Sequence, residues 1–224
     1  AGWYDPASSY QGGLLGGGVR ALVLAPDQTW DGRAFAATRA GIAFSPYRGD
    51  SWYQVNDGLP QLTVRAFALA PNDPQVMLAG TGYFEQLRFD SGSITDDAGN
   101  VQLSRDGGQS WRQVSGRLAR VNGLAFSPNF AVDETAFAAT GMIGQHGFVE
   151  GGIYRTTDGG ENWTAVSPIA HAYNAIAISP NYANDHTVWA SALSYTMAVG
   201  VYRSTDGGST WALIAPGLNV QRLV

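Results

Sequence analysis

The chain has 224 residues, of which 45% are hydrophobic and 12% aromatic, which is enough for a continuous buried core and excludes a disordered chain. A formal net charge of −5 gives no general attraction to nucleic acid or to an anionic membrane. With no cysteine, the chain has neither disulfides nor thiolate metal sites.

The chain begins with "AGWYDPASSY", which has neither the basic nor the apolar segment of a secretory signal. If the protein is exported, we therefore expect this chain to be already processed. No run of about 18 apolar residues, the length that a membrane-spanning helix needs, occurs in the sequence.

Four similar segments are expected to form a first kind of strand: "VRALVLAP", "VRAFALAP", "VNGLAFSP" and "YNAIAISP", which begin at Val19, Val64, Val121 and Tyr173. Each ends at a proline, which cannot donate a hydrogen bond to a sheet. Large and small residues alternate along them. The large ones are Leu22, Leu24, Phe67, Leu69, Leu124, Phe126, Ile176 and Ile178.

Three further segments follow each first strand in the same order. "GRAFAAT", "QVMLAGT", "ETAFAAT" and "HTVWASA" are rich in residues that suit pleated surfaces and predict second strands. "GIAFS", "NVQLS", "GIYRT" and "GVYRS" predict third strands, and short segments such as "WRQV" and "WTAV" predict fourth strands. The 29 glycines and 10 prolines fit the many turns of such an all-β chain, for which we expect no helix.

A repeated turn separates the third strand from the fourth. It reads "SRDGGQSW" at residues 104–111, "TTDGGENW" at 156–163 and "STDGGSTW" at 204–211, while "SPYRGDSW" at 45–52 is a degraded copy in which Tyr47 replaces the aspartate. The carboxylate can accept hydrogen bonds from its own turn, and a glycine can adopt positive φ without strain. We expect a self-contained structural staple, formed by Asp106, Trp111, Asp158, Trp163, Asp206 and Trp211.

Four-stranded units that repeat every 48 to 59 residues are typical of β-propeller blades. A parallel β-helix has much shorter coils. The alternating large and small residues fit blades that pack face to face around a crowded axis. We predict an all-β propeller with full blades at residues 19–56, 64–115, 121–167 and 173–215 and partial blades at 1–5 and 220–224, as a single domain or a propeller fragment.

The predicted blade count also bears on how the propeller closes. A closed propeller commonly needs more than four blades, so we expect either further sequence or another chain to complete this one.

The pattern hydroxyl-x-Asp-x-Gly-x-polar-Trp resembles the Asp-box (BNR) repeat of several propeller families. These include sialidases, xyloglucan-degrading glycosidases, sortilin-type receptors and photosystem II stability factors. The resemblance covers nearly the whole chain and implies a structural box between third and fourth strands, away from the usual ligand site. It implies a fold and leaves the function open.

A polar residue occupies the second position of every first strand. These residues are Arg20, Arg65, Asn122, Asn174 and Gln221. In a propeller they would ring one mouth of the central channel, either as hydrophilic lining or, at Arg20 and Arg65, as a subsite for an anion or a partner carboxylate.

The loops that enter the first strands, and those between second and third strands, are expected together on one face. They are either ligand contacts, since loops on a rigid scaffold usually carry binding, or acidic, solvated surface loops. The longest extend over residues 83–100, 142–151 and 194–199. Their candidate ligand-binding residues are Asp96, Asp97, His146 and Tyr195, and the other loop carboxylates are Asp90 and Glu150, with possible sugar platforms at Tyr83, Phe84 and Phe148.

An enzymatic role requires more than these residues. A sialidase-like site needs an Arg-Ile-Pro motif that the sequence lacks, and no spacing fixes the carboxylate pair of a glycosidase. His146, His171 and His186 lack metal-ligand spacing, and the sequence predicts no metal, no cofactor and no catalytic residue. We expect a non-catalytic, extracytoplasmic propeller module that binds a protein or glycan partner, with a xyloglucan-type glycoside hydrolase domain as the alternative.

Overall fold

A computed structural model describes residues 18–25, 32–82, 99–143, 149–167, 171–193, 198–218 and 220. The predicted partial blade at residues 1–5 lies outside these ranges, as does the one at 220–224 except for Val220. Among the described residues, no helix has the length and apolar character needed to cross a membrane.

The described strands form four antiparallel sheets of four strands, each in simple chain order. The first sheet holds β1 (Ala21–Leu24), β2 (Ala34–Thr38), β3 (Gly41–Ser45) and β4 (Tyr53–Gln54). The second holds β5 (Val64–Ala70), β6 (Asp73–Thr81), β7 (Val101–Ser104) and β8 (Arg112–Gln113).

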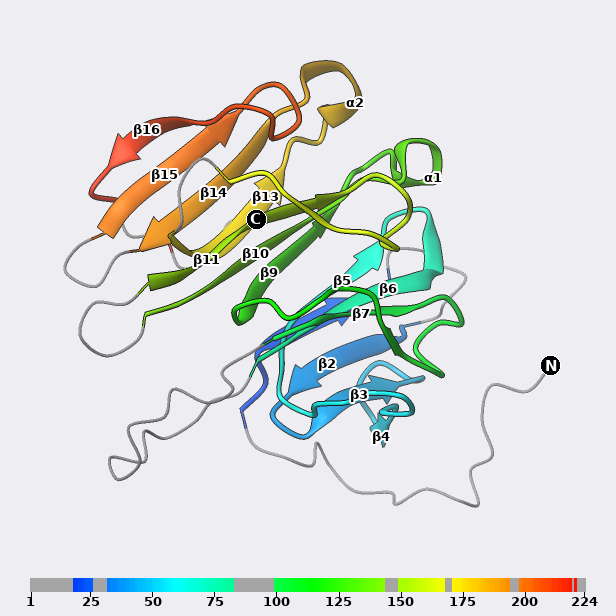
Figure 1. Ribbon diagram of the computed structural model, residues 1–224. Helices are drawn as coiled ribbons and strands as arrows, with labels where there is room; N and C mark the ends of the chain where they lie inside the picture. The colour runs from blue at the N-terminus through cyan, green and yellow to red at the C-terminus, as the bar shows by residue number, and fades with distance from the viewer. Residues whose placement is uncertain are drawn as a thin grey trace, which may run out of the picture.

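The third sheet holds β9 (Val121–Phe126), β10 (Ala136–Ile143), β11 (Val149–Thr156) and β12 (Thr164–Ala165). The fourth holds β13 (Ala172–Ile178), β14 (Val188–Leu193), β15 (Ala198–Ser204) and β16 (Ala212–Pro216). The sheets follow one another in space in chain order, as successive blades (Figure 1). The prediction of an all-β propeller of four-stranded blades is therefore confirmed.

The core lies between the blades. Phe67 of blade two stacks on Phe35 of blade one, with ring centroids 5.6 Å apart. At the junction of blades three and four, a Cβ added to Gly123 would lie 3.3 Å from the backbone nitrogen of Ile176. Large residues of each first strand thus face the preceding blade, and the small residues face the following one, as the alternation predicts.

Two one-turn helices, α1 (Phe130–Asp133) and α2 (Tyr182–Asp185), connect the first and second strands of blades three and four. They lie on the same side of the molecule (Figure 1). The expectation that the chain has no helix was wrong, because a single turn is too short to leave a helical period in the sequence.

An aspartate closes each helical turn. The Ser127 hydroxyl donates to Oδ2 of Asp133 at 2.6 Å, and the backbone N–H of Thr135 donates to Oδ1 at 2.9 Å. The equivalent bonds in blade four measure 2.7 and 2.9 Å. The matching sequences "SPNFAVDET" and "SPNYANDHT" are therefore a second kind of stapled turn.

Gln102 provides a test of the packing between blades one and two. Its side chain is 0% exposed, and neither its amide oxygen nor its amide nitrogen has a hydrogen-bond partner among the described residues. Because an unsatisfied buried amide costs about 1–3 kcal/mol, Gln102→Leu is expected to raise the free energy of unfolding by about 1 kcal/mol in urea titrations.

Gln113→Leu, on the exposed strand β8, is the matched control and should bring no such gain. A loss of stability on Gln102→Leu would contradict this interpretation.

Candidate functional site

Backbone hydrogen bonds define the two sides of the propeller. The N–H of Gly159, in the turn before β12, donates at 3.0 Å to the carbonyl of Glu134, which follows α1. The turns between third and fourth strands therefore lie beside the connections between first and second strands, and we call this the turn side. The starts of the first strands and the ends of the second strands lie at the opposite end, which we call the loop side.

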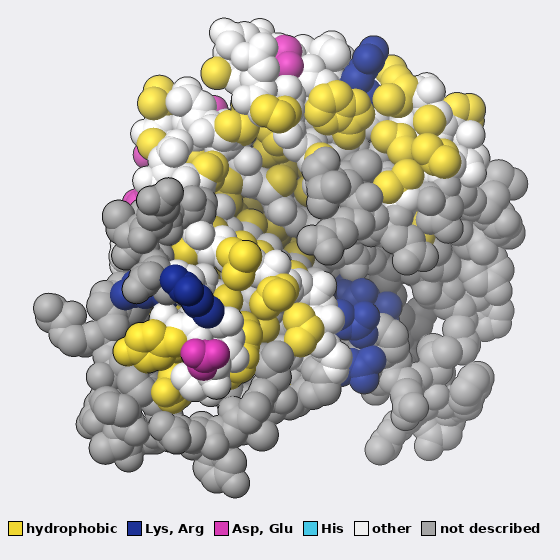
Figure 2. Space-filling model, turned by 180° about the vertical axis from the view of Figure 1, so that it is seen from behind, with side chains coloured by type: hydrophobic (Ala, Val, Ile, Leu, Met, Phe, Trp, Pro, Cys, Tyr) yellow, Lys and Arg dark blue, Asp and Glu magenta, His cyan; other side chains and the backbone are white. Residues whose placement is uncertain are grey.

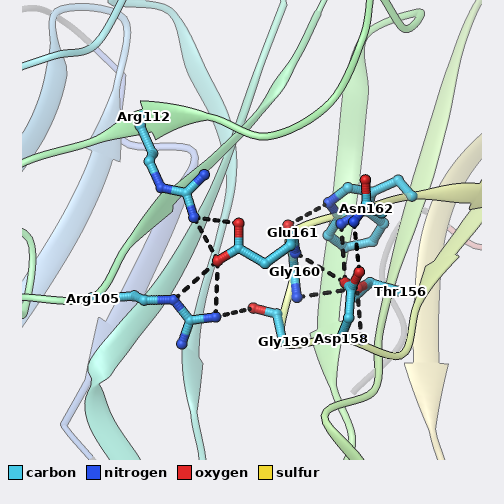
Figure 3. Close-up of polar contacts among 9 residues, drawn as sticks. Arg105, Arg112, Thr156, Asp158, Gly159, Gly160, Glu161 and Asn162 are labelled. Atoms are coloured by element: carbon cyan, nitrogen blue, oxygen red, sulfur yellow. Dashed lines mark hydrogen bonds and ion pairs between the residues drawn. The ribbon is translucent and has the colours of Figure 1, made fainter.

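Each Asp-Gly-Gly turn is closed by a network around its aspartate, and Figure 3 shows the network of Asp158. Oδ1 of Asp158 accepts from the Thr156 hydroxyl at 2.7 Å and from the backbone N–H of Asn162 at 3.0 Å. Its Oδ2 accepts from the Asn162 amide at 2.7 Å. Thr156 in turn accepts from the N–H of Gly160 at 3.0 Å, so the hydroxyl and the carboxylate staple the turn together.

These donors stabilise the charged carboxylates. Bonds from the backbone and side chain of Asn162 lower the pKa of Asp158 to about 2, and bonds from the Thr210 hydroxyl and backbone do the same for Asp206. Burial alone would raise the pKa of Asp106, but bonds from Ser110 and Ser104 hold it below its usual value. Carboxylates of this kind are ionised acceptors at neutral pH and cannot act as general acids there.

The degraded copy keeps half of the staple. In blade one the Ser45 hydroxyl still accepts from the N–H of Gly49 at 2.9 Å, although Tyr47 supplies no carboxylate. Tyr47 is 66% exposed. The hydroxyl bond thus holds the turn even where the aspartate is absent.

The turn tryptophans differ in their partners, which corrects the expectation of a self-contained staple. Trp163 Nε1 donates within its own turn, to the Gly160 carbonyl at 3.0 Å. Trp111 Nε1 instead donates to the Val55 carbonyl of the preceding blade at 3.0 Å. Trp211 Nε1 lies between two acceptors, the Gly208 carbonyl of its own turn at 3.0 Å and the Val166 carbonyl of the preceding blade at 2.8 Å. Two of the three turns are therefore also links between blades.

Arginines link successive turns. Arg105 Nη2 donates to the Gly159 carbonyl of the next blade at 3.1 Å, and Arg155 Nη1 donates to the Gly207 carbonyl of the next blade at 2.7 Å. Glu161 also pairs with Arg112 and Arg105, which lowers its pKa (Figure 3). No sequence pattern indicates these contacts, because they join residues about one repeat apart through the stacking of blades.

On the loop side, three of the predicted channel residues form a connected row, which we call the axial row: Arg65, Asn122 and Asn174. Arg65 Nε donates to Oδ1 of Asn122 at 3.2 Å. Asn122 Nδ2 donates to the Tyr173 carbonyl of the next blade at 3.0 Å, and Asn174 Nδ2 donates to the Val220 carbonyl at 2.7 Å.

The backbone explains why this row is polar. In blades two, three and four the strand pairing skips Arg65, Asn122 and Asn174, so each is the extra residue of a β-bulge. A bulge re-aims its side chain away from the face that the flanking residues share. The sequence shows the polar position but not the bulge, which depends on the register of two strands.

The other predicted site residues have different outcomes. Arg20 is exposed, and its backbone N–H donates to the Ala37 carbonyl at 2.9 Å. Gln221 and the candidates Asp96, Asp97, His146 and Tyr195 lie outside the described residues, as do Asp90, Tyr83, Phe84 and Phe148. Glu150 lies in β11, where only its backbone is described.

The two described histidines lie in different surroundings. His171 is half-buried beside Tyr173 and Tyr202, with ring centroids 6.2 Å from each, and burial lowers its pKa. His186 is exposed and follows α2 with a φ of 47°. Among the described residues, no group of three or more His, Cys, Asp or Glu side chains could hold a metal ion.

Arginine side chains gather in a few places on the face shown in Figure 2, whereas acidic side chains are scattered. Chemically, the turn side offers carboxylates that are already engaged as acceptors, and the axial row offers guanidinium and amide groups that already donate across the blade junctions. Such groups can bind hydroxyls or carboxylates of a partner, but they supply no acid–base pair.

Comparison with known proteins identifies the fold through solved structures and not through the sequence. No family model and no curated protein matches the sequence. An ancestral GH74 enzyme matches the structure with a TM-score of 0.70 and 21% sequence identity, over 96% of this chain and 28% of that one.

Two further GH74 structures match in the same way. The GH74 xyloglucanase of Xanthomonas campestris matches with a TM-score of 0.66 at 19% identity, over 93% of this chain and 31% of that one. The GH74 enzyme of Niastella koreensis matches with a TM-score of 0.61 at 19% sequence identity, over 89% of this chain and 30% of that one. This chain thus spans about three tenths of their length, and at such identity the likeness shows the propeller fold.

The lowered pKa values predict how the staples respond to acid. Stability from Asp158 and Asp206 is fully present above the usual pKa of 3.8 and is lost as the pH falls toward about 2. The double variant Asp158→Asn, Asp206→Asn should therefore be less stable at pH 7 and should lose less stability across that window in urea titrations. An unchanged slope in the double variant would sink the prediction.

Proposed function

We propose that this chain is a non-catalytic propeller module that binds a glycan or protein partner on its loop side. The observation that carries the proposal is the separation of polar groups between the two sides. Asp106, Asp158 and Asp206 on the turn side are engaged by donors of their own turns. The axial row instead gathers a guanidinium and two amides near the loops, where they donate hydrogen bonds between successive blades and would have to extend or exchange these bonds to hold a partner.

A glycan suits this arrangement better than a nucleic acid. Amide and guanidinium groups at the mouth of a channel can donate to sugar hydroxyls or to a carboxylate, whereas the net charge of −5 opposes binding to phosphate backbones. The stapled turns support an assignment of the repeat to the Asp-box type. A glycan partner would place the protein outside the cytoplasm, at a cell surface or in a secreted or periplasmic assembly.

The alternative is a glycoside hydrolase domain, and the observation in its favour is the fold likeness to GH74 enzymes. It would require two carboxylates separated by about 5–5.5 Å or 6.5–9.5 Å across a sugar. Asp96, Asp97, Asp90 and Glu150 would have to supply that pair.

Binding and cleavage of xyloglucan oligosaccharides separate the two functions. We expect calorimetry to detect binding that weakens about tenfold or more in Arg65→Ala, because a charged hydrogen bond contributes about 1.5–3 kcal/mol. Arg105→Ala removes an arginine from the turn side and should leave the affinity unchanged. We expect no reducing sugar to be released.

Release of reducing sugar that is lost in Asp96→Asn or Asp97→Asn would replace this proposal with the hydrolase. For an acidic partner, binding that survives both Arg20→Ala and Arg65→Ala would rule out the anion subsite.

A further inference from the structure

The side of blade four that faces away from blade three carries the features by which earlier blades hold their successors. The three junctions inside the molecule show these features, so they also show what fits this side. A large side chain on the second strand occurs at all three junctions, and an arginine beside the turn and the axial row occur at the junctions of blades two and three and of blades three and four.

The large side chain lies beneath the second glycine of the next turn. A Cβ added to that glycine would lie 3.1–3.5 Å from it at every junction; the pairs are Phe35 with Gly108, Leu78 with Gly160, and Phe137 with Gly208. In blade four the same register position is Trp189, which pairs with Ala177 and Arg203 as Phe137 pairs with Ala125 and Arg155. Trp189 therefore occupies the position from which a large side chain packs beneath the second glycine of the next turn.

The arginine donates to the carbonyl of the first glycine of the next turn, as Arg155 does to Gly207 at 2.7 Å. Arg203 has the register position of Arg155, and its side chain is exposed. A turn seated on Trp189 would bring a glycine carbonyl to this guanidinium.

The axial row already continues past blade four. Asn122 donates at 3.0 Å to the carbonyl of Tyr173, at the start of the first, innermost strand of blade four. Asn174 donates in the same way to the Val220 carbonyl at 2.7 Å. Ser191, on the same side as Trp189, is 0% exposed, and its hydroxyl has no partner among the described residues. Val220 thus stands where a further inner strand would start.

We propose that this side of blade four binds a fifth blade of the same repeat, whose inner strand begins at Val220 and whose third turn carries an Asp-Gly-Gly sequence. Arg203 donates to its first glycine carbonyl, and Trp189 packs beneath its second glycine.

A second copy of this chain fits the same side less well. Its open side is that of blade one, where Leu22 and Leu24 are 55% and 67% exposed. The turn of blade one has Arg48 in place of the first glycine, because Arg48 N–H bonds to Gly32 as Gly107 N–H bonds to Gln75. A second copy would therefore set Arg48 against Arg203, and like charges repel.

The test adds a fifth blade to the chain. In one extended protein a copy of residues 173–224 replaces residues 220–224, and in a second a copy of residues 121–167 does so. We expect both to melt at a higher temperature than the parent chain. Arg203→Ala should lower the melting temperature of the extended proteins by about 2–4 °C and leave that of the parent nearly unchanged.

Arg155→Ala is the matched control, since its bond to Gly207 exists in every version, and it should lower the melting temperature of both parent and extended proteins. Two extended proteins no more stable than the parent would overturn the proposal, as would an equal effect of Arg203→Ala on parent and extended chains. A parent that sediments as a dimer and dissociates on Arg203→Ala would identify a second copy as the occupant and would also overturn it.

Discussion

The structure depends on the packing of one blade against the next. A single four-stranded sheet has two faces, and here the large residues of one face, such as Phe67 and Ile176, are buried against the preceding blade. Repeats of this kind are stable as neighbours rather than alone. The turn tryptophans, the linking arginines and the axial row each add a polar contact across the same junctions, so apolar burial and hydrogen bonding act between the same pairs of sheets.

This packing also separates the side whose polar groups hold the turns from the side where side chains of different blades meet. On the turn side, hydroxyls and backbone N–H groups converge on Asp158 and its counterparts, so these carboxylates are acceptors in a closed network. On the loop side, the strands deliver side chains of different blades to one axis. A propeller that binds a partner therefore has one side on which loops can vary while the other side holds the sheets.

The propeller fold was predictable because its repeat is explicit: strand, turn and tryptophan recur, and the alternation of large and small residues identifies which face meets which blade. The structural details that the sequence did not reveal are those that depend on register or on two blades at once. The bulge at Asn122 requires the pairing of β9 with β10, and the bond from Trp111 to Val55 requires the stacked sheets. The one-turn helices were not predicted because four residues are too few to show a helical period in the sequence. The loop candidates Asp96, Asp97, His146 and Tyr195 lie outside the described residues and stay predictions.

The bulges at the start of the first strands separate the chemistry of a side chain from the packing of the core, which a regular strand couples. In a regular strand, changing a residue on the packed face disturbs the core, but Arg65, Asn122 and Asn174 stand outside that alternation. Their chemistry can change while the large and small residues beside them keep their contacts. Under the proposed function, substitutions at this one position per repeat would change the specificity of the loop side while the apolar contacts between blades stay in place, at the cost of the hydrogen bonds that Asn122 and Asn174 donate across the junctions.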